Sequence, residues 1–192
     1  MRIQLKIAVV SALALCSLNA CKSQYEMLLN SADTEAKYKA AFDYFNNKKY
    51  SRAAAMFESL SMFTEGTEKD DTVRYYWGLS NYRQKDYYTA ETNFQRFLEV
   101  YPRSPFASDA RFLRIDCLYR STLRYELDQT PTYTALNAMT EYLREEPDNS
   151  HLADCEAMIK DLNERLDRKA YEGAKLYYRM EDYLAARVAL KN

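Results

Sequence analysis

The chain has 192 residues, 47% apolar and 14% aromatic, with 18 tyrosines but only three glycines and four prolines. This composition favours a folded helical protein with bulky interlocking side chains over a β-rich protein with many turns. The net charge of −1 argues against a nucleic-acid partner, which would favour a strongly basic face.

Residues 1–20 predict a lipoprotein signal peptide. They begin with basic residues, and the apolar stretch at 7–18 is shorter than the ~20 residues that span a bilayer as a helix. The stretch ends in LNAC at 18–21, which resembles a bacterial lipobox with Cys21 as the lipidated residue. The alternative is an ordinary cleaved signal followed by an incidental cysteine. A Cys21 that carries two or more acyl chains would anchor the protein stably without spanning the membrane.

Residues 21–32 are polar and predict a tether, and the helical region 33–192 follows it. Apolar residues at i, i+3, i+4 and i+7 spacing predict a first helix over 38–45 and a second over 50–60. The turn between them lies at 46–49. A loop at 64–71 precedes the next helix, where Asp70 or Asp71 can act as the N-cap.

A second helix pair is predicted over 75–82 and from 87 through 97, with Pro102 ending the second helix. In the third pair, Ser104 and Pro105 are expected at the N-cap and first turn of one helix, and Thr130-Pro131 at the start of the other. A long helix follows from about His151 to Arg168 and runs on through 171–180. The pattern of the second helix of a pair restarts at 183–190.

One phrase occurs twice in the chain: YTAETNFQRFLEVYP at 88–102 returns as YTALNAMTEYLREEP at 133–147. A small residue, a large apolar residue, an aromatic residue and a proline at fixed offsets are typical of the second helix of a tetratricopeptide repeat. The corresponding alanines at 53, 90, 135 and 186 are all further apart than the ~34-residue period of that repeat. The sequence therefore predicts an all-α, tetratricopeptide-repeat (TPR-like) helical solenoid of antiparallel helix pairs. It would hold about three full repeats plus an incomplete fourth; the alternative is an unrelated helical bundle with chance periodicity.

The last predicted helix reaches Leu190, two residues before the end of the sequence. Solenoids normally carry a capping helix that covers the terminal apolar face. We therefore expect either a truncated chain, which we favour, or an exposed end that docks on a partner.

The cysteine and histidine content argues against site chemistry. Cys117 and Cys155 could form one disulfide in an oxidising compartment, although two buried helix thiols are the favoured interpretation. There is no CxxC pair, and His151, the only histidine, is expected at the surface near a helix start. No catalytic set, phosphate loop or metal-ligand cluster is recognisable, so neither an enzyme nor a cofactor is expected.

Four features together resemble the outer-membrane β-barrel assembly lipoproteins of the BamD type, a tetratricopeptide-repeat family. They are the lipobox cysteine Cys21, the repeat junction FQRFLEVYPRSP at 94–105, its recurrence over 142–150, and LDRKAYEGAKLYYRMEDYLAA at 166–186. The resemblance covers essentially all of the mature chain. The family usually has five repeats, and the fifth is absent from this sequence.

The resemblance implies a non-enzymatic adaptor on the periplasmic face of the outer membrane. Its C-terminal repeats would bind the periplasmic domains of the barrel-inserting component, and its N-terminal repeats would receive C-terminal segments of unfolded outer-membrane proteins. The absence of Asp after Cys21 agrees with outer-membrane retention by analogy with lipoprotein sorting. The alternative is another envelope repeat lipoprotein, serving cell constriction or peptidoglycan synthesis.

Repeat alignment predicts a peptide-binding groove on the concave side of the first two repeats. Aromatic walls with Asn and Arg suit an extended or helical peptide with aromatic anchors, and Arg83 could meet a carboxylate. The alternative for each aromatic residue is packing between helices. The groove residues are Tyr38, Phe42, Phe45, Asn46, Tyr75, Leu79, Tyr82 and Arg83.

Overall fold

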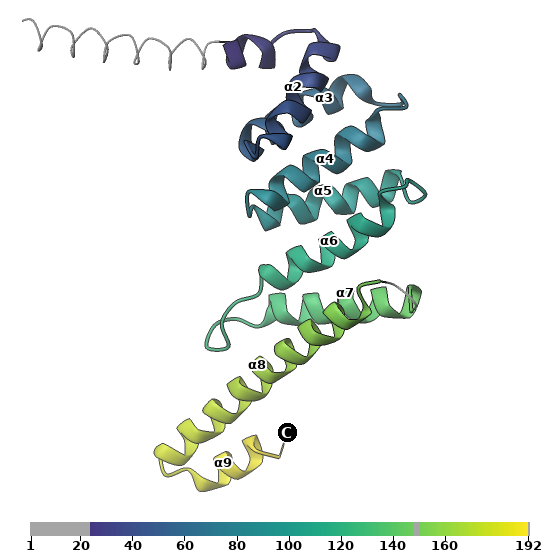
Figure 1. Cartoon of the computed structure of the whole chain (residues 1–192). Helices are drawn as coiled ribbons and strands as arrows, with labels where there is room; N and C mark the ends of the chain where they lie inside the picture. Colours follow the sequence, from purple (N-terminus) through teal and green to yellow (C-terminus); the bar gives the residue numbers. More distant parts are fainter. Residues whose placement is uncertain (1–23, 148–149, 192) are drawn as a thin grey trace, which may run out of the picture. The chain divides into compact units, whose positions relative to one another are not determined.

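A computed structural model describes residues 24–147 and 150–191, which are helical with short connections and contain no strand (Figure 1). From the first helix to Gln84, and again from Lys85 to the last helix, consecutive helices pack against each other, so the predicted all-α repeat of helix pairs is confirmed. The residues of the predicted signal peptide and Cys21 lie outside the described part. The labelled helices are α2 Thr34–Asn46, α3 Tyr50–Thr64, α4 Asp70–Arg83, α5 Tyr87–Val100, α6 Ala107–Arg120, α7 Thr130–Glu145, α8 Leu152–Arg179 and α9 Tyr183–Ala189.

The chain divides into two compact units, Met1–Gln84 and Lys85–Asn192, here called unit 1 and unit 2. Unit 1 contains α2–α4 and unit 2 contains α5–α9. The division falls between the two helices of the second predicted repeat, so each unit is described by itself.

The predicted tether differs from the structure in its described part. Residues 24–29 form a short helix, and Tyr25, Leu28 and Leu29 pack against the core of unit 1. Burial of these three side chains stabilises the folded segment, and an extended tether in solvent would lack that stabilisation. The tether interpretation is therefore wrong for this segment.

The core of unit 1 lies between α2, α3 and α4. Small residues on α2 and α3 allow the helices to approach, and larger side chains on α3 fill the space between them. The first turn of α4 contains Asp70, which is fully buried and accepts hydrogen bonds from Thr64 Oγ (2.9 Å) and Arg74 Nε (2.9 Å). The N-cap position of α4 is Lys69, so the prediction that Asp70 or Asp71 is the N-cap is wrong, although the Asp71 carboxylate accepts from the Thr72 N–H of the first turn. The buried core residues are Ala41, Ala53, Met56, Phe57, Leu60 and Val73.

In unit 2, the start of α6 differs from the sequence prediction, whereas α7 begins at Thr130 with Pro131 in its first turn, as predicted. The N-cap of α6 is Phe106, because the segment before it forms turns in which Ser104 Oγ accepts from the Phe106 N–H (3.3 Å). The N-cap of α7 is Gln129, and Asp128 accepts from the Thr130 N–H and hydroxyl. The main core of this unit consists of Ile115, Ala135, Met139, Tyr142, Cys155 and Leu162.

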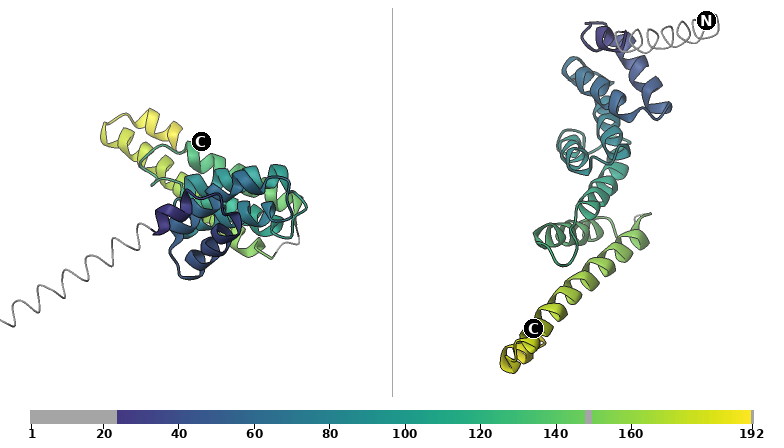
Figure 2. Two further views of the ribbon diagram at one scale, coloured as in Figure 1. Left: turned by 90° about the horizontal axis from the view of Figure 1, so that it is seen from above. Right: turned by 90° about the vertical axis from the view of Figure 1, so that its left-hand side faces the viewer.

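The predicted long helix is confirmed as α8, a single helix of 28 residues. Figure 2 shows it as one continuous rod with α9 folded back against its C-terminal end. The start of α9 is capped by Asp182, whose carboxylate accepts from the Ala185 N–H at 2.9 Å.

Cys117 and Cys155 are buried free thiols, which agrees with the favoured interpretation. Burial raises the pKa of the Cys117 thiol to about 12 and that of Cys155 to about 11. In residues 24–147 and 150–191, no helix is both long and apolar enough to cross a bilayer, and no group of His, Cys, Asp and Glu is placed to hold a metal ion.

Candidate functional site

Aromatic rings of α2 and α4 form a continuous chain in unit 1. Phe42 and Phe45 both contact Tyr76, with centroid separations of 4.8 and 5.1 Å in edge-to-face geometry. Tyr38 extends the chain along α2, 4.9 Å from Phe42. We call Tyr38, Phe42, Phe45 and Tyr76 the aromatic strip. All of its members are half-buried and pack against the core of unit 1.

Of the eight predicted groove residues, six are half-buried or exposed and two are buried. Tyr38, Phe42 and Phe45 belong to the aromatic strip, Tyr82 is half-buried, and Asn46 and Arg83 are exposed. Tyr75 is 4% exposed and Leu79 9% exposed, so both mainly pack inside the protein. Tyr75 still contacts the strip, because its ring centroid lies 5.4 Å from that of Tyr76.

A pocket lies at the Tyr38 end of the strip. Its cavity volume is about 400 Å³, within the range of ordinary ligand pockets. Tyr38, Leu60 and Phe63 provide apolar walls, while threonines and charged residues provide polar groups. The lining is completed by Thr34, Glu35, Thr64, Thr67, Glu68 and Lys69.

Lys69 supplies a cation to this pocket. Its Nζ lies 4.8 Å from the centroid of the Tyr38 ring and 2.6 Å from Glu35 Oε1. The hydrogen bond to the Glu35 carboxylate raises the pKa of Lys69. Since both side chains of the ion pair are largely exposed, an incoming carboxylate can compete with Glu35 for the ammonium group.

The sequence pattern does not single out Tyr76, Phe63 or Lys69. Tyr76 directly follows Tyr75, and a helical repeat pattern alone does not show which of two adjacent aromatics points to the neighbouring helix. Phe63 and Lys69 flank a loop that the repeat pattern does not align. The signal available in the sequence was an aromatic residue, Phe63, a few residues before a basic residue, Lys69.

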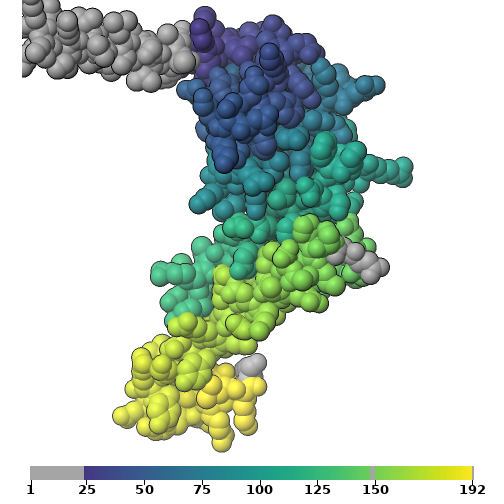
Figure 3. Space-filling model, in the orientation of Figure 1, coloured from purple at the N-terminus to yellow at the C-terminus, as the bar shows by residue number. Residues whose placement is uncertain are grey.

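Unit 2 presents a second kind of surface, formed by exposed apolar residues around the C-terminal end of α8 and α9. This region is the yellow end of the space-filling view (Figure 3). A neighbouring pocket of about 510 Å³ has a floor of small residues that includes Ala170, Gly173 and Ala174. The exposed apolar residues are Tyr171, Leu176, Tyr177, Tyr178, Met180, Tyr183, Leu184, Val188 and Leu190.

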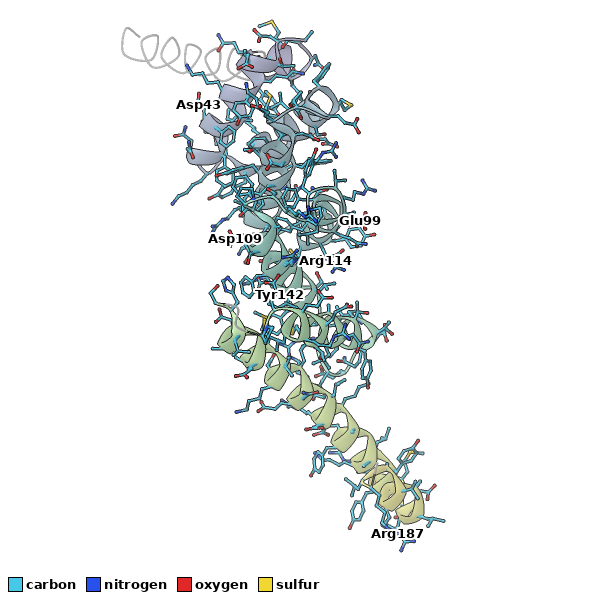
Figure 4. The ribbon with its side chains drawn as sticks, turned by 90° about the vertical axis from the view of Figure 1, so that its right-hand side faces the viewer. Asp43, Glu99, Asp109, Arg114, Tyr142 and Arg187 are labelled. Carbon is cyan, nitrogen blue, oxygen red and sulfur yellow. The ribbon has the colours of Figure 1, made fainter. Side chains whose placement is uncertain are left out.

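A smaller pocket of about 160 Å³ in unit 2 is lined by residues of α5, α6 and α7, including Arg114 and Tyr142, which are labelled in Figure 4. Arg114 Nε donates to Glu91 at 2.8 Å. The Tyr142 hydroxyl is buried without a hydrogen-bond partner among the described residues, and burial raises its pKa to about 12. This pocket is a weaker candidate than the one beside Tyr38, because its volume is about 160 Å³ against about 400 Å³.

Comparison with known proteins gives two matches. The family described as "YfiO: Outer membrane lipoprotein" matches residues 30–190. The chain is also 21% identical over 183 residues to the Outer membrane protein assembly factor BamD of Caulobacter vibrioides. That alignment covers 94% of this chain and 60% of the relative, so the chain spans about 60% of the relative's length.

Proposed function

The chain belongs to the outer membrane lipoprotein family YfiO, and on that premise we propose that it acts as a binding protein in the assembly of outer-membrane proteins. The family places it at the outer membrane, held by a lipid anchor on the periplasmic face. Cys21 is the residue that would carry the lipid, because it ends the lipobox-like sequence. The function requires binding surfaces and no catalytic step.

The aromatic strip with its pocket is the observation that supports client binding. An unfolded outer-membrane protein would place a C-terminal aromatic side chain in the pocket beside Tyr38 and lay the preceding residues along the strip. Full burial of a phenylalanine side chain contributes about 1.5–3 kcal/mol, and edge-to-face ring contacts add about 0.5–1.5 kcal/mol. Such a site would select aromatic anchors while tolerating varied residues between them.

Two cations are candidates for the C-terminal carboxylate of the client. Lys69 lies at the pocket itself, within 4.8 Å of the Tyr38 ring centroid. Arg83 lies at the C-terminal end of α4 and is exposed. The position of Lys69 at the pocket favours it as the carboxylate partner, with Arg83 left to contact residues further along the peptide.

For the C-terminal apolar surface of unit 2 we adopt the second of the two expectations, docking on a partner. It would dock the barrel-inserting component through the periplasmic domains of that component. Clustered exposed aromatic and apolar side chains mark interaction sites, because isolated soluble proteins rarely expose them together. The open floor at Gly173 would let a partner side chain approach the backbone of α8.

A fluorescent peptide that ends in an aromatic residue tests the client site. Tyr38→Ala is expected to weaken its binding about tenfold or more, equivalent to about 1.4 kcal/mol, because the ring forms one wall of the pocket. Tyr88→Ala is the matched control, since Tyr88 is 83% exposed and lies in unit 2. Equal affinity of wild type and Tyr38→Ala, with helix content unchanged, would contradict the site.

The same titration distinguishes the two cations. Amidation of the peptide C-terminus should weaken binding to wild type and have little further effect on Lys69→Met. A continued effect of amidation on Lys69→Met, together with its loss in Arg83→Met, would assign the carboxylate to Arg83 instead.

A further inference from the structure

We propose that unit 1 rests directly on the membrane that holds the lipid anchor. The contact surface consists of the helix at 24–29 and the last turn of α3, with Met27, Met62 and Phe63 inserted into a zwitterionic phospholipid surface. This inference rests on the proposed lipidation of Cys21.

The covalent chain leaves little distance between the anchor and the folded unit. Only three peptide steps separate Cys21 from Gln24, the first described residue of the helix at 24–29. Three residues span at most about 11 Å even when fully extended. A lipidated Cys21 therefore keeps this helix within about one helix diameter of the headgroup region.

The helix at 24–29 is fixed to unit 1. The Tyr25 ring packs edge-to-face on Tyr44 with centroids 5.6 Å apart, and the Arg52 guanidinium lies 5.1 Å from the Tyr25 centroid. At the other end, Ser59 Oγ donates to the Leu29 carbonyl at 3.3 Å. Because both ends of this helix are held, the limit on its distance from Cys21 applies to unit 1 as a whole.

The exposed apolar residues of unit 1 are confined to this region. In its described part, the exposed large apolar side chains are Met27 (65% exposed), Met62 (73%) and Phe63 (51%). Met62 and Phe63 lie one turn beyond Ser59 on α3, on the side of that helix that meets Leu29. Flexible methionine side chains adapt well to an irregular apolar environment, and an interfacial surface of this kind penetrates about 5–10 Å into the headgroup and acyl boundary.

A buried lysine holds Phe63 at this surface. Lys37 is 2% exposed, and its Nζ donates to Ser59 Oγ at 2.7 Å. The same ammonium group lies 5.2 Å from the centroid of the Phe63 ring, a favourable cation–π distance. Phe63 also lines the client pocket, so Met27 and Met62 identify the membrane contact more specifically.

The charges around the surface select the type of lipid. Glu26, Glu58 and Glu65 are exposed and flank the apolar residues in sequence, whereas the exposed Lys69, which lines a pocket with Phe63, is paired with Glu35. Carboxylates next to the insertion point repel anionic headgroups, since like charges near a membrane surface act over about a Debye length. The expected surface is therefore zwitterionic.

Depth-dependent quenching tests the contact in the full-length lipidated protein. Met62→Cys would carry an environment-sensitive fluorophore in phosphatidylcholine–phosphatidylethanolamine vesicles that contain nitroxide lipid. The control is Lys49→Cys, at the other end of α3 and about 20 Å away along the helix axis. The native thiols Cys117 and Cys155 are buried with raised pKa values, so they should stay unlabelled. Quenching at 62 should exceed that at 49 by roughly threefold, and a label at Met27→Cys should behave like the one at 62.

The outcomes separate docking from anchoring. Equal quenching at 62, 27 and 49 in vesicle-bound protein would overturn the docking surface and leave the lipid anchor intact. If wild type and Cys21→Ala bound vesicles equally poorly, lipidation at Cys21 and the docking surface would both be overturned. Stronger quenching after addition of phosphatidylglycerol would overturn the assignment to a zwitterionic surface.

Discussion

Asp70 connects α3 to α4 inside unit 1. Its carboxylate is fully buried and joins Thr64, the last residue of α3, to Arg74, one turn further along α4. A buried carboxylate is tolerated only when hydrogen-bond donors and a counter-charge compensate its lost hydration. Asp70 therefore links the two ends of this loop, in addition to the hydrogen bonds that Thr67 donates to the Thr64 carbonyl.

Replacement of Asp70 should destabilise the protein. Asp70→Ala is expected to lower the free energy of unfolding by about 2–4 kcal/mol, because it leaves Arg74 and Thr64 without their buried partner. Urea denaturation followed by helix content measures the change. The matched control is Glu35→Ala, which removes an exposed ion pair and should cost less than about 1 kcal/mol. Similar losses for both variants would contradict the special role of Asp70.

The residues of the candidate site were only partly predictable. Helical spacing placed Tyr38, Phe42 and Phe45 on one face. In the structure, Tyr76 contacts both Phe42 and Phe45, and Tyr38 contacts Phe42. The same spacing could not show that Tyr75 and Leu79 are buried, because burial depends on which helices surround a face. The pocket also needed Lys69, which lies in a loop outside the repeat pattern.

At the level of helices, the long α8 followed from its unbroken amphipathic sequence, whereas the helix at 24–29 did not follow from its own. A six-residue helix has almost no stability in isolation. It forms here because Tyr25, Leu28 and Leu29 find a complementary core surface, and that tertiary contact is not visible in a local pattern.

Gly173 lies inside α8, where a side chain would meet no other atom within 4 Å. Gly173→Ala should therefore raise the free energy of unfolding by about 0.5–1 kcal/mol, because alanine has the higher helix propensity. Thermal unfolding should show an increase of about 2–4 °C per kcal/mol for a protein of this size.

Gly66 provides a matched control for Gly173. It is equally open, but its φ of +78° is one that side chains rarely adopt, so Gly66→Ala should destabilise by about 1 kcal/mol. If both alanine variants changed stability in the same direction, the explanation by backbone conformation would be wrong.

At the scale of the whole molecule, the two units present different surfaces. Unit 1 has an aromatic strip, a pocket with a cation and a short connection to the proposed anchor. Unit 2 has a long helix and a cluster of exposed apolar residues at its C-terminal end. We propose that unit 1 receives clients and unit 2 docks the insertion component.

The fold class and the family were predictable at this scale, because repeat landmarks recur across the chain and a few residues at fixed offsets define them. The division into two units between Gln84 and Lys85 was not, since it separates two helices that the repeat pattern assigns to one pair. Periodicity shows which face of a helix is apolar. It does not show how strongly successive helices pack against each other.

Capture of the tagged, lipidated protein from detergent-solubilised envelope tests the assembly role most directly. The barrel-inserting component should co-purify with wild type and with Tyr88→Ser, whose exposed side chain lies elsewhere in unit 2. Recovery should fall about tenfold or more for Tyr178→Ser combined with Leu184→Ser, because these variants remove exposed apolar side chains from the proposed docking surface. Recovery of other envelope proteins without the barrel-inserting component would contradict the proposed function.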